Sequence, residues 1–234
     1  MLKVEHVTIG YGDRILAKDI SFELAKGECV LLAGPNGTGK TTLLKKLASE
    51  GIGPLILIPT NIPKVKGFTV EAFIHTGCYK ESDWRGKVSK ETEQRMEEAL
   101  EVLGIKELRK RDISTLSDGE FQKACLATGL TRKAEVLLLD EPTAHLDVEN
   151  RIDVLRTLRE VARKTGTAIL FSSHDLHDAL RVVDRIFALT RDGRFLTAGP
   201  FDRLRAPESS VIPSEAKESM EEVLRDAFPH LSSL

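Results

Sequence analysis

Residues 29–42, Cys-Val-Leu-Leu-Ala-Gly-Pro-Asn-Gly-Thr-Gly-Lys-Thr-Thr, carry the clearest structural signal in the sequence. The first five form a continuous apolar run, which favours a strand buried on both faces. The pattern from Thr41 to Leu47 favours a helix. The loop between them fits G-x-x-x-x-G-K-[ST], the P-loop pattern, in which backbone N–H groups and a helix N-terminus face phosphate oxygens. The segment therefore predicts a strand–loop–helix unit that binds a nucleotide.

Two side chains of this unit are expected to act directly on the phosphates. Lys40 can reach the β- and γ-phosphates, and the Thr41 hydroxyl can ligate Mg²⁺. A chance match to the pattern has a probability of roughly 1 in 100 in a chain of this length. The predicted nucleotide-binding residues are Gly34, Pro35, Asn36, Gly37, Thr38, Gly39, Lys40, Thr41 and Thr42.

Two acidic residues follow another apolar run, residues 136–139. A carboxylate at the end of a buried strand beside the P-loop strand can hold the Mg²⁺ shell, and Asp140 is the candidate. Glu141 can orient and deprotonate an attacking water as a general base, although acidic residues also end strands without a catalytic role. His174 follows a further apolar run and is a candidate contact of the γ-phosphate. A lone histidine is more often structural or a helix cap, so that alternative stays open.

Strands and helices alternate along most of the chain. Apolar residues at Ile20, Phe22 and Leu24 alternate with polar ones, which predicts a half-buried strand. This order predicts an α/β fold with a mostly parallel sheet and a helical insert near residues 68–128. The other expected elements are buried strands at 55–58, 136–139 and 167–172, helices at 89–103, 148–164 and 214–228, and a hairpin with a primed turn at 192–193.

Composition excludes several classes of protein. Among 234 residues, 30% are charged and 41% hydrophobic, which excludes a disordered chain. The 34 Lys and Arg against 36 Asp and Glu give a net charge of −2 and no support for a nucleic-acid interface. The apolar runs are too short to span a membrane, and the start lacks a signal-peptide core. Three widely spaced cysteines without a CxxC pair indicate buried thiols in a reducing compartment. We therefore expect a soluble cytoplasmic protein.

Residues 116–120, Leu-Ser-Asp-Gly-Glu, resemble LSGGQ, the signature motif of the ATP-binding cassette (ABC) family of ATPases. The order of P-loop, signature, residues 140–141 and His174 is also that of the family, and the resemblance covers roughly residues 1–205. It implies a P-loop NTPase core with a mostly parallel sheet, a reduced antiparallel β-subdomain and a helical subdomain at about residues 68–128. Residues 206–234 are then a C-terminal helical extension.

The resemblance also implies a mode of assembly. Two cassettes dimerise head to tail and sandwich two ATP molecules, so that the P-loop of one copy faces the signature of the other. Ser117 and Gly119 should then contact the partner's ATP, and Asp147, in the D-loop, should cross the interface. Tyr11 lies where the family places an aromatic residue that stacks on adenine. The alternative is a tyrosine that only ends a strand.

The sequence departs from the family pattern at three places. Thr60 stands where a Mg²⁺-sensing glutamine is expected, although Asn61 would supply an amide if the backbone shifted by a residue. Thr60 lies only twenty positions after Lys40, so a hairpin of the antiparallel subdomain is missing and a sheet edge must be protected by other means. Asp118 replaces the first signature glycine, and we expect it to be the N-cap of the following helix.

Segments at residues 61–63, 67–70 and 76–79 are similar to those of importers of iron–siderophore, haem and cobalamin complexes. This similarity implies an ATPase that uses ATP and Mg²⁺, joins transmembrane permease subunits and lies on the cytoplasmic face of the membrane. Cassettes of this kind contact ATP and not the cargo, so the sequence does not identify the cargo.

Two alternatives remain open at this point. One is a soluble ABC ATPase of iron–sulfur cluster assembly; a DNA-repair member is disfavoured because only 75 residues separate Lys40 from Leu116, too few for a long coiled-coil insertion. The other is a nucleotide-binding regulatory module with little turnover, which Thr60 and the short β-region motivate. The basic run at residues 106–111 is expected to be a solvated helix end and not a nucleic-acid contact.

Overall fold

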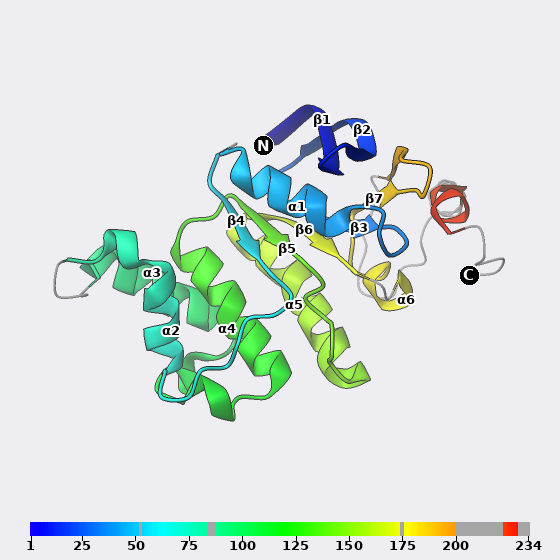
Figure 1. Cartoon of the computed structure of the whole chain (residues 1–234). Coiled ribbons are helices and arrows are strands. Elements are labelled where there is room, and N and C mark those ends of the chain that lie inside the picture. Colours follow the sequence, from blue (N-terminus) through cyan, green and yellow to red (C-terminus); the bar gives the residue numbers. More distant parts are fainter. Residues whose placement is uncertain (52, 84–87, 174–175, 200–221, 229–234) are drawn as a thin grey trace.

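The computed structural model describes residues 1–51, 53–83, 88–173, 176–199 and 222–228. A six-stranded sheet has the strand order β4-β5-β6-β3-β7-β8, in which β7 and β8 pair antiparallel and the other neighbours pair parallel. A separate antiparallel pair, β1-β2, lies beyond α1 (Figure 1). The strands are β1 (Leu2–Tyr11), β2 (Arg14–Leu24), β3 (Cys29–Ala33), β4 (Leu55–Ile58), β5 (Val136–Leu139), β6 (Ala168–Ser172), β7 (Arg185–Leu189) and β8 (Phe195–Ala198).

Helices cover both faces of the large sheet. The α1 helix lies between this sheet and the β1-β2 pair, while α4 and α5 lie on the opposite face (Figure 1). The predicted α/β fold with a mostly parallel sheet and a small antiparallel pair is thus confirmed. The helices are α1 (Lys40–Ser49), α2 (Val70–Gly77), α3 (Lys90–Val102), α4 (Asp118–Thr131), α5 (Val148–Thr165) and α6 (Leu176–Ala179), with short 3-10 helices η1 (Tyr79–Glu81), η2 (Lys106–Leu108) and η3 (Ile113–Thr115).

The continuous apolar runs of the central strands arise because both faces of the sheet are covered. Successive residues of a strand point to opposite faces. Val30 and Leu32 belong to the core shared with β1, β2 and α1, whereas Leu31 belongs to the core shared with α2 to α5. Every residue of β3, β5 and β6 is buried, as the runs predicted.

The helical segment from α2 to α4 forms a side lobe of the molecule (Figure 1). The predicted helix at residues 89–103 is α3, which Ser89 caps by accepting a hydrogen bond from Thr92 N. Met96, Leu100 and Leu103 are buried on its predicted apolar face. Both α2 and α3 pack against α4, which in turn packs against α5. The side lobe is therefore joined to the sheet through α4.

Two local predictions are wrong. A type I′ turn needs positive φ at both central residues and a type II′ turn at the first, but in the loop of Arg191, Asp192 and Gly193 positive φ falls on Gly193 (81°) and not on Asp192. The loop has three residues because Thr190 N donates to the carbonyl of Arg194. The strand at 55–58 is also not buried on both faces: β4 is an edge strand of the sheet, and its residues alternate between half-buried and buried.

The predicted C-terminal helix at residues 214–228 falls partly outside the described residues. Within them, residues 222–227 are helical, and Val223, Leu224 and Ala227 are buried in the core that contains α4 and α5. Arg194 and Asp226 form an ion pair of 3.1 Å, which joins this helix to the β7-β8 hairpin. No helix in the described part of the chain is long and apolar enough to cross a membrane.

Candidate functional site

The P-loop joins the carboxyl end of β3 to the first turn of α1, as predicted. Its glycines are needed for backbone geometry. Gly34 has φ 149°, and a Cβ there would lie 2.5 Å from the carbonyl oxygen of Leu189 and 2.8 Å from Thr38 Oγ1. Gly37 has φ 82°, and a Cβ there would meet no atom of the described residues within 4 Å, so within this part of the chain glycine is required by the backbone conformation alone. Gly39, with φ 104°, is the N-cap residue of α1.

Lys40 lies inside this loop. Its Nζ donates to the carbonyl oxygens of Gly34 at 2.7 Å and Pro35 at 3.3 Å, and the residue is 6% exposed. Burial lowers the pKa of Lys40, while the carboxylates of Glu141 and Asp140 act in the opposite direction. The ammonium group is therefore held against two carbonyl oxygens of the loop, where it can meet a phosphate oxygen that enters the loop.

Asp140 follows β5 and lies next to the start of α1, because the carboxyl ends of parallel strands meet at one edge of the sheet. Thr41 Oγ1 donates to Asp140 Oδ1 and Oδ2 at 3.0 and 2.9 Å. Ser172, at the end of β6, also donates to Asp140 Oδ1 at 3.0 Å. The hydroxyl and carboxylate oxygens of Thr41 and Asp140 are the ligands that Mg²⁺ prefers, so the described residues fit such an ion.

Ser172 is a residue that the sequence reasoning missed. Its Oγ accepts a hydrogen bond of 2.9 Å from Glu141 N while donating to Asp140. Glu141 has φ 50°, a conformation that costs energy for a residue other than glycine and persists only where the surroundings impose it. The sequence feature that could have indicated Ser172 is a polar residue at the end of an otherwise apolar strand. His174, predicted to be catalytic together with Glu141 and Lys40, lies outside the described residues.

Tyr11 ends β1 beside the first turn of α1. Its hydroxyl accepts a hydrogen bond of 2.5 Å from Thr42 Oγ1, and the residue is 64% exposed. The ring is thus attached to the P-loop helix with much of its surface open to solvent. Stacking on adenine stays a prediction, and this placement is compatible with it.

Thr60, in the position of the expected glutamine, bonds to the backbone and not to the Asp140 side chain. Its Oγ1 donates to the carbonyl oxygen of Asp140 at 2.8 Å. Thr60, Asn61 and Glu141 share the wall of a cavity of about 390 Å³, which extends to Phe121 on α4. The segment after β4 therefore lies between the end of β5, where Asp140 follows, and the signature helix α4.

The signature segment differs from the prediction at its first turn. Ser117, and not Asp118, is the N-cap of α4: its Oγ accepts from Glu120 N at 3.1 Å, and Glu120 Oε2 accepts from Ser117 N at 2.8 Å. This reciprocal capping box places Asp118 in the first helical turn, where its carboxylate pairs with Lys64 at 2.6 Å. Gly119 is buried, and a Cβ there would lie 2.9 Å from Asn150 Oδ1. Contact of Ser117 and Gly119 with a partner's ATP stays a prediction.

Asp147, the predicted interface residue, has a role within its own chain. It is the N-cap of α5 and accepts hydrogen bonds of 2.8 Å from Asn150 N and Nδ2. The backbone N–H of Asn150 also lowers the pKa of the Asp147 carboxyl. The residue is exposed, so a further contact across an interface is a prediction that this capping role permits.

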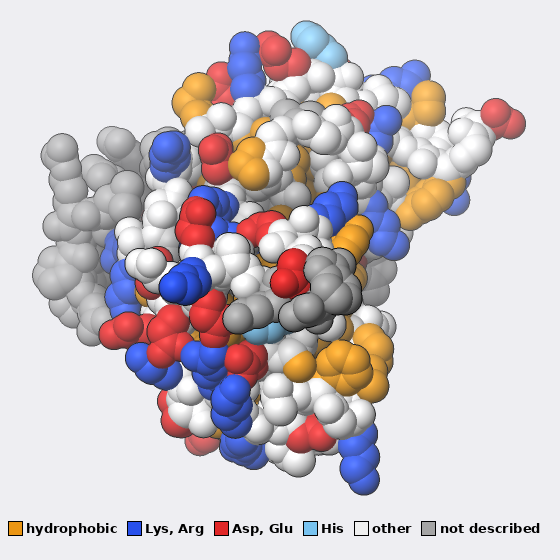
Figure 2. Space-filling view, turned by 90° about the vertical axis from the view of Figure 1, so that its left-hand side faces the viewer, with side chains coloured by type: hydrophobic (Ala, Val, Ile, Leu, Met, Phe, Trp, Pro, Cys, Tyr) orange, Lys and Arg blue, Asp and Glu red, His pale blue; other side chains and the backbone are white. Residues whose placement is uncertain are grey.

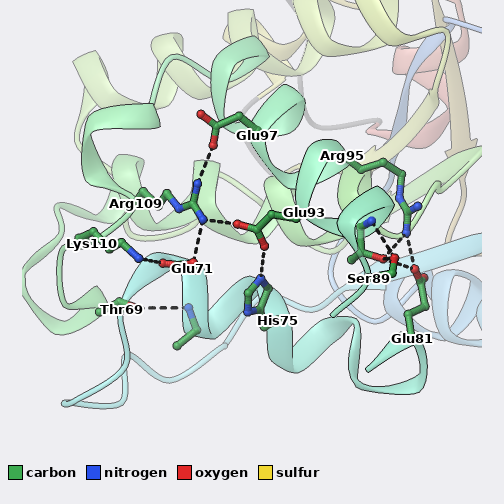
Figure 3. A network of polar contacts seen from close by, with 12 residues as sticks. Thr69, Glu71, His75, Glu81, Ser89, Glu93, Arg95, Glu97, Arg109 and Lys110 are labelled. Carbon is green, nitrogen blue, oxygen red and sulfur yellow. Dashed lines mark hydrogen bonds and ion pairs between the residues drawn. The ribbon is translucent and has the colours of Figure 1, made fainter. Parts of the chain in front are cut away.

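The basic run at residues 106–111 is exposed at Lys106, Lys110 and Arg111, as expected for a solvated helix end, but Arg109 is half-buried. The run also takes part in an ion-pair network on the side lobe (Figure 3). Arg109 bonds to Glu71 and Glu97, both at 2.8 Å, and to Glu93. The Arg109 bond is the main cause that lowers the pKa of Glu71 to about 2. On this face, acidic and basic side chains are interspersed (Figure 2). Further pairs of the run are Lys106 with Glu97, Lys110 with Glu71, and Arg111 with Glu120.

Part of this network has the composition of a metal site. Glu71, His75 and Glu93 each offer a ligand atom, and these atoms lie within 4.8 Å of one another. However, Arg109 bonds to both carboxylates and Lys110 bonds to Glu71 (Figure 3). A divalent cation would have to displace positive charge that is already in place, so we interpret the cluster as the ion-pair network that joins α2 to α3.

Comparisons with known proteins agree with this geometry. The model of the family described as ABC transporter matches residues 17–53 and 57–144, more than half of the chain. The iron(3+)-hydroxamate import ATP-binding protein FhuC of Bacillus subtilis is 31% identical over 212 residues, 81% of this chain and 79% of FhuC. The zinc import ATP-binding protein ZnuC of Jannaschia sp. is 33% identical over 226 residues, 91% of this chain and 88% of ZnuC. A solved metal-chelate type ABC transporter in an inward-facing conformation superimposes with a TM-score of 0.75 at 25% identity, over 85% of this chain and 83% of that one.

Proposed function

The chain belongs to the ABC transporter family, and we propose that it is the ATP-hydrolysing subunit of an importer of chelated iron. As a member of this family it binds ATP. The observation that carries the proposal is a relative named for import of iron(3+)-hydroxamate, similar over four-fifths of both chains. The nucleotide site supports the proposal, because the P-loop, Asp140 and the signature helix occur together in one fold.

The residues of the site divide the work of hydrolysis between them. The loop N–H groups and Lys40 bind the phosphates, while Thr41 and Asp140 hold Mg²⁺, which neutralises phosphate charge when bound. Glu141, next to Asp140, orients and deprotonates the attacking water, a general-base contribution of about 10²–10⁴ in rate. Ser172 positions both acids, since it bonds to the Asp140 carboxylate and to Glu141 N. In this scheme His174 contacts the γ-phosphate.

The proposed working unit is a head-to-tail dimer joined to permease subunits at the cytoplasmic face of a membrane. Each P-loop faces the signature segment of the other copy, so that ATP binding closes the dimer and hydrolysis reopens it. Ser117 is exposed at the N-terminus of α4 and its hydroxyl hydrogen is not needed for the capping bond that it accepts. The hydroxyl is therefore able to donate to a phosphate of the facing nucleotide.

A second candidate function is zinc import. ZnuC of Jannaschia sp. matches a larger share of this chain than FhuC does, at a similar level of identity. An uptake assay with radiolabelled iron–hydroxamate and radiolabelled zinc, in native cells with and without the chain, separates the two cargoes. Loss of only one of the two uptakes identifies the cargo.

The proposal is tested by purifying the tagged chain from detergent-solubilised membranes of its native cells. Recovery with a multi-span permease is the expected result, and recovery only in the soluble fraction would overturn the transporter assignment. The uptake assay is repeated with Lys40→Ala, which removes the buried ammonium group from the loop. The matched control is Lys45→Ala, because Lys45 is an exposed lysine of the same helix. Lys40→Ala should abolish uptake and Lys45→Ala should retain it.

A further inference from the structure

Lys64 connects the segment after β4 to the start of the signature helix. Its Nζ donates to Asp118 Oδ1 at 2.6 Å and to the carbonyl oxygen of Leu116 at 2.8 Å. The ammonium group also lies 5.5 Å from the centre of the Phe121 ring. The Lys64 side chain is 26% exposed and that of Asp118 is 61% exposed. A single lysine is therefore held by three groups at the N-terminus of α4.

The segment that carries Lys64 is attached at its other end to the nucleotide site. Thr60 Oγ1 bonds to the carbonyl oxygen of Asp140, and Lys64 lies four residues later along the chain. The same short segment thus contacts the strand end that supplies Asp140 and the helix that carries the signature. This attachment at both ends limits where the Lys64 charge can lie.

The position of the Lys64 ammonium group matters because of the charges at the N-terminus of α4. A helix N-terminus attracts anions, but the first turn of α4 already holds two carboxylates of its own, Asp118 and Glu120. Each of them pairs with a cation from another segment: Asp118 with Lys64, and Glu120 with Arg111 at 3.5 Å. Without these cations, the two carboxylates would repel a phosphate that approaches the helix.

We propose that Lys64 is a positioning residue that neutralises Asp118, so that the N-terminus of α4 can receive the phosphates of the ATP held by a second copy of the chain. This role rests on the head-to-tail dimer proposed above. It also explains how the chain uses an aspartate where the LSGGQ motif has a glycine. The carboxylate is compatible with a nearby phosphate because Lys64 supplies the compensating charge.

The test measures the ATP concentration that gives half-maximal dimer, by analytical ultracentrifugation with Mg²⁺ and in a Glu141→Gln background that blocks turnover. Lys64→Met removes the charge but keeps an apolar stem against Phe121, and should raise the required ATP concentration about fivefold or more. Adding Asp118→Asn to Lys64→Met should restore the parent value, because no charge is then left to compensate. The Lys64→Met defect should shrink at high salt.

The matched control is Lys123→Met. Lys123 lies on the signature helix α4, which also carries Asp118. It pairs with Asp153 at 2.7 Å, with side-chain exposures of 19% for Lys123 and 58% for Asp153. Its removal should change the ATP requirement less than twofold. Thermal melting of every variant separates lost stability from lost dimerisation.

Each outcome decides a different claim. If the Glu141→Gln parent does not dimerise with ATP, the proposed dimer is wrong, and this role of Lys64 is wrong with it. If the parent dimerises but Lys64→Met matches it within twofold, the role of Lys64 alone is overturned. If Lys64→Met is impaired and Asp118→Asn does not rescue it, neutralisation of Asp118 is overturned, and Lys64 acts through Leu116 or Phe121 instead.

Discussion

Replacing Gly34 by alanine should weaken ATP binding strongly, whereas the same change at Gly37 should weaken binding only modestly. Both glycines belong to the P-loop and both have positive φ, 149° and 82°. They differ in their surroundings. A Cβ at position 34 would lie 2.5 Å from the Leu189 carbonyl oxygen, whereas a Cβ at position 37 would meet no atom within 4 Å among the residues that the structure describes.

The structure separates the two costs. At Gly37 the penalty is the conformational one, about 1–2 kcal/mol for a side chain in the left-handed region. This limits the loss of affinity to roughly five- to thirtyfold. At Gly34 a steric cost of about 1–3 kcal/mol is added, because Leu189 belongs to β7, which is paired on both sides and cannot move away. The sum of about 2–5 kcal/mol corresponds to a loss of affinity of roughly thirtyfold to several thousandfold.

Isothermal titration with ATP and Mg²⁺ measures both affinities, and circular dichroism with thermal melting shows whether each variant is folded. The expected order of decreasing affinity is wild type, then Gly37→Ala, then Gly34→Ala. Equal losses for the two variants would refute the steric argument. Binding by folded Gly34→Ala within threefold of wild type would show that the loop lies differently.

Three further predictions concern the acids and the thiols. Glu141→Gln should reduce ATP turnover by about 10² or more while retaining ATP; equal phosphate release by variant and wild type would remove its proposed role. Arg109 depresses the pKa of Glu71 from 4.5 to about 2, so the ionised form stabilises the fold above pH 4.5 and this stabilisation is lost as pH falls toward 2. Glu71→Gln should therefore lower the free energy of unfolding, measured with urea, by about 1 kcal/mol at pH 7. At pH 3.5 the variant should differ less from wild type, and a difference that stays the same at both pH values would contradict this. Burial raises the pKa of the Cys125 thiol to about 12 and also raises the pKa of the Cys29 thiol. Neither thiol should therefore react with a thiol reagent until the protein is denatured. Rapid labelling of either cysteine in the native protein would show that it is accessible.

Some parts of the site could be predicted because they depend on neighbours along the chain. The P-loop pattern needs a strand, a glycine-rich turn and a helix in immediate succession, and all three follow from local composition. Asp140 was found because it directly follows a buried apolar run. Ser172 was missed because its importance comes from a bond to Asp140, 32 residues earlier. No local pattern distinguishes such a serine from any polar residue that ends a strand.

The cap of α4 shows a second limit. Ser117 and Asp118 are both good N-cap residues, so local preference could not decide between them. In the folded chain, Glu120 reaches back to Ser117 N, and Lys64, 54 residues before Asp118, binds the aspartate in the first turn. The first residue of the helix was thus selected jointly by a local capping box and a distant lysine.

The sequence by itself determined the strand and helix types, the α/β class and the location of the phosphate loop, because apolar periodicity and glycine spacing act over a few residues. The tertiary structure decided which side chains meet. It brought Thr41, Asp140 and Ser172 together at one sheet edge, and it surrounded Arg109 with three glutamates from two helices. The physical reason is that parallel strand order and helix packing set these distances, and both depend on burying apolar surface across the whole chain.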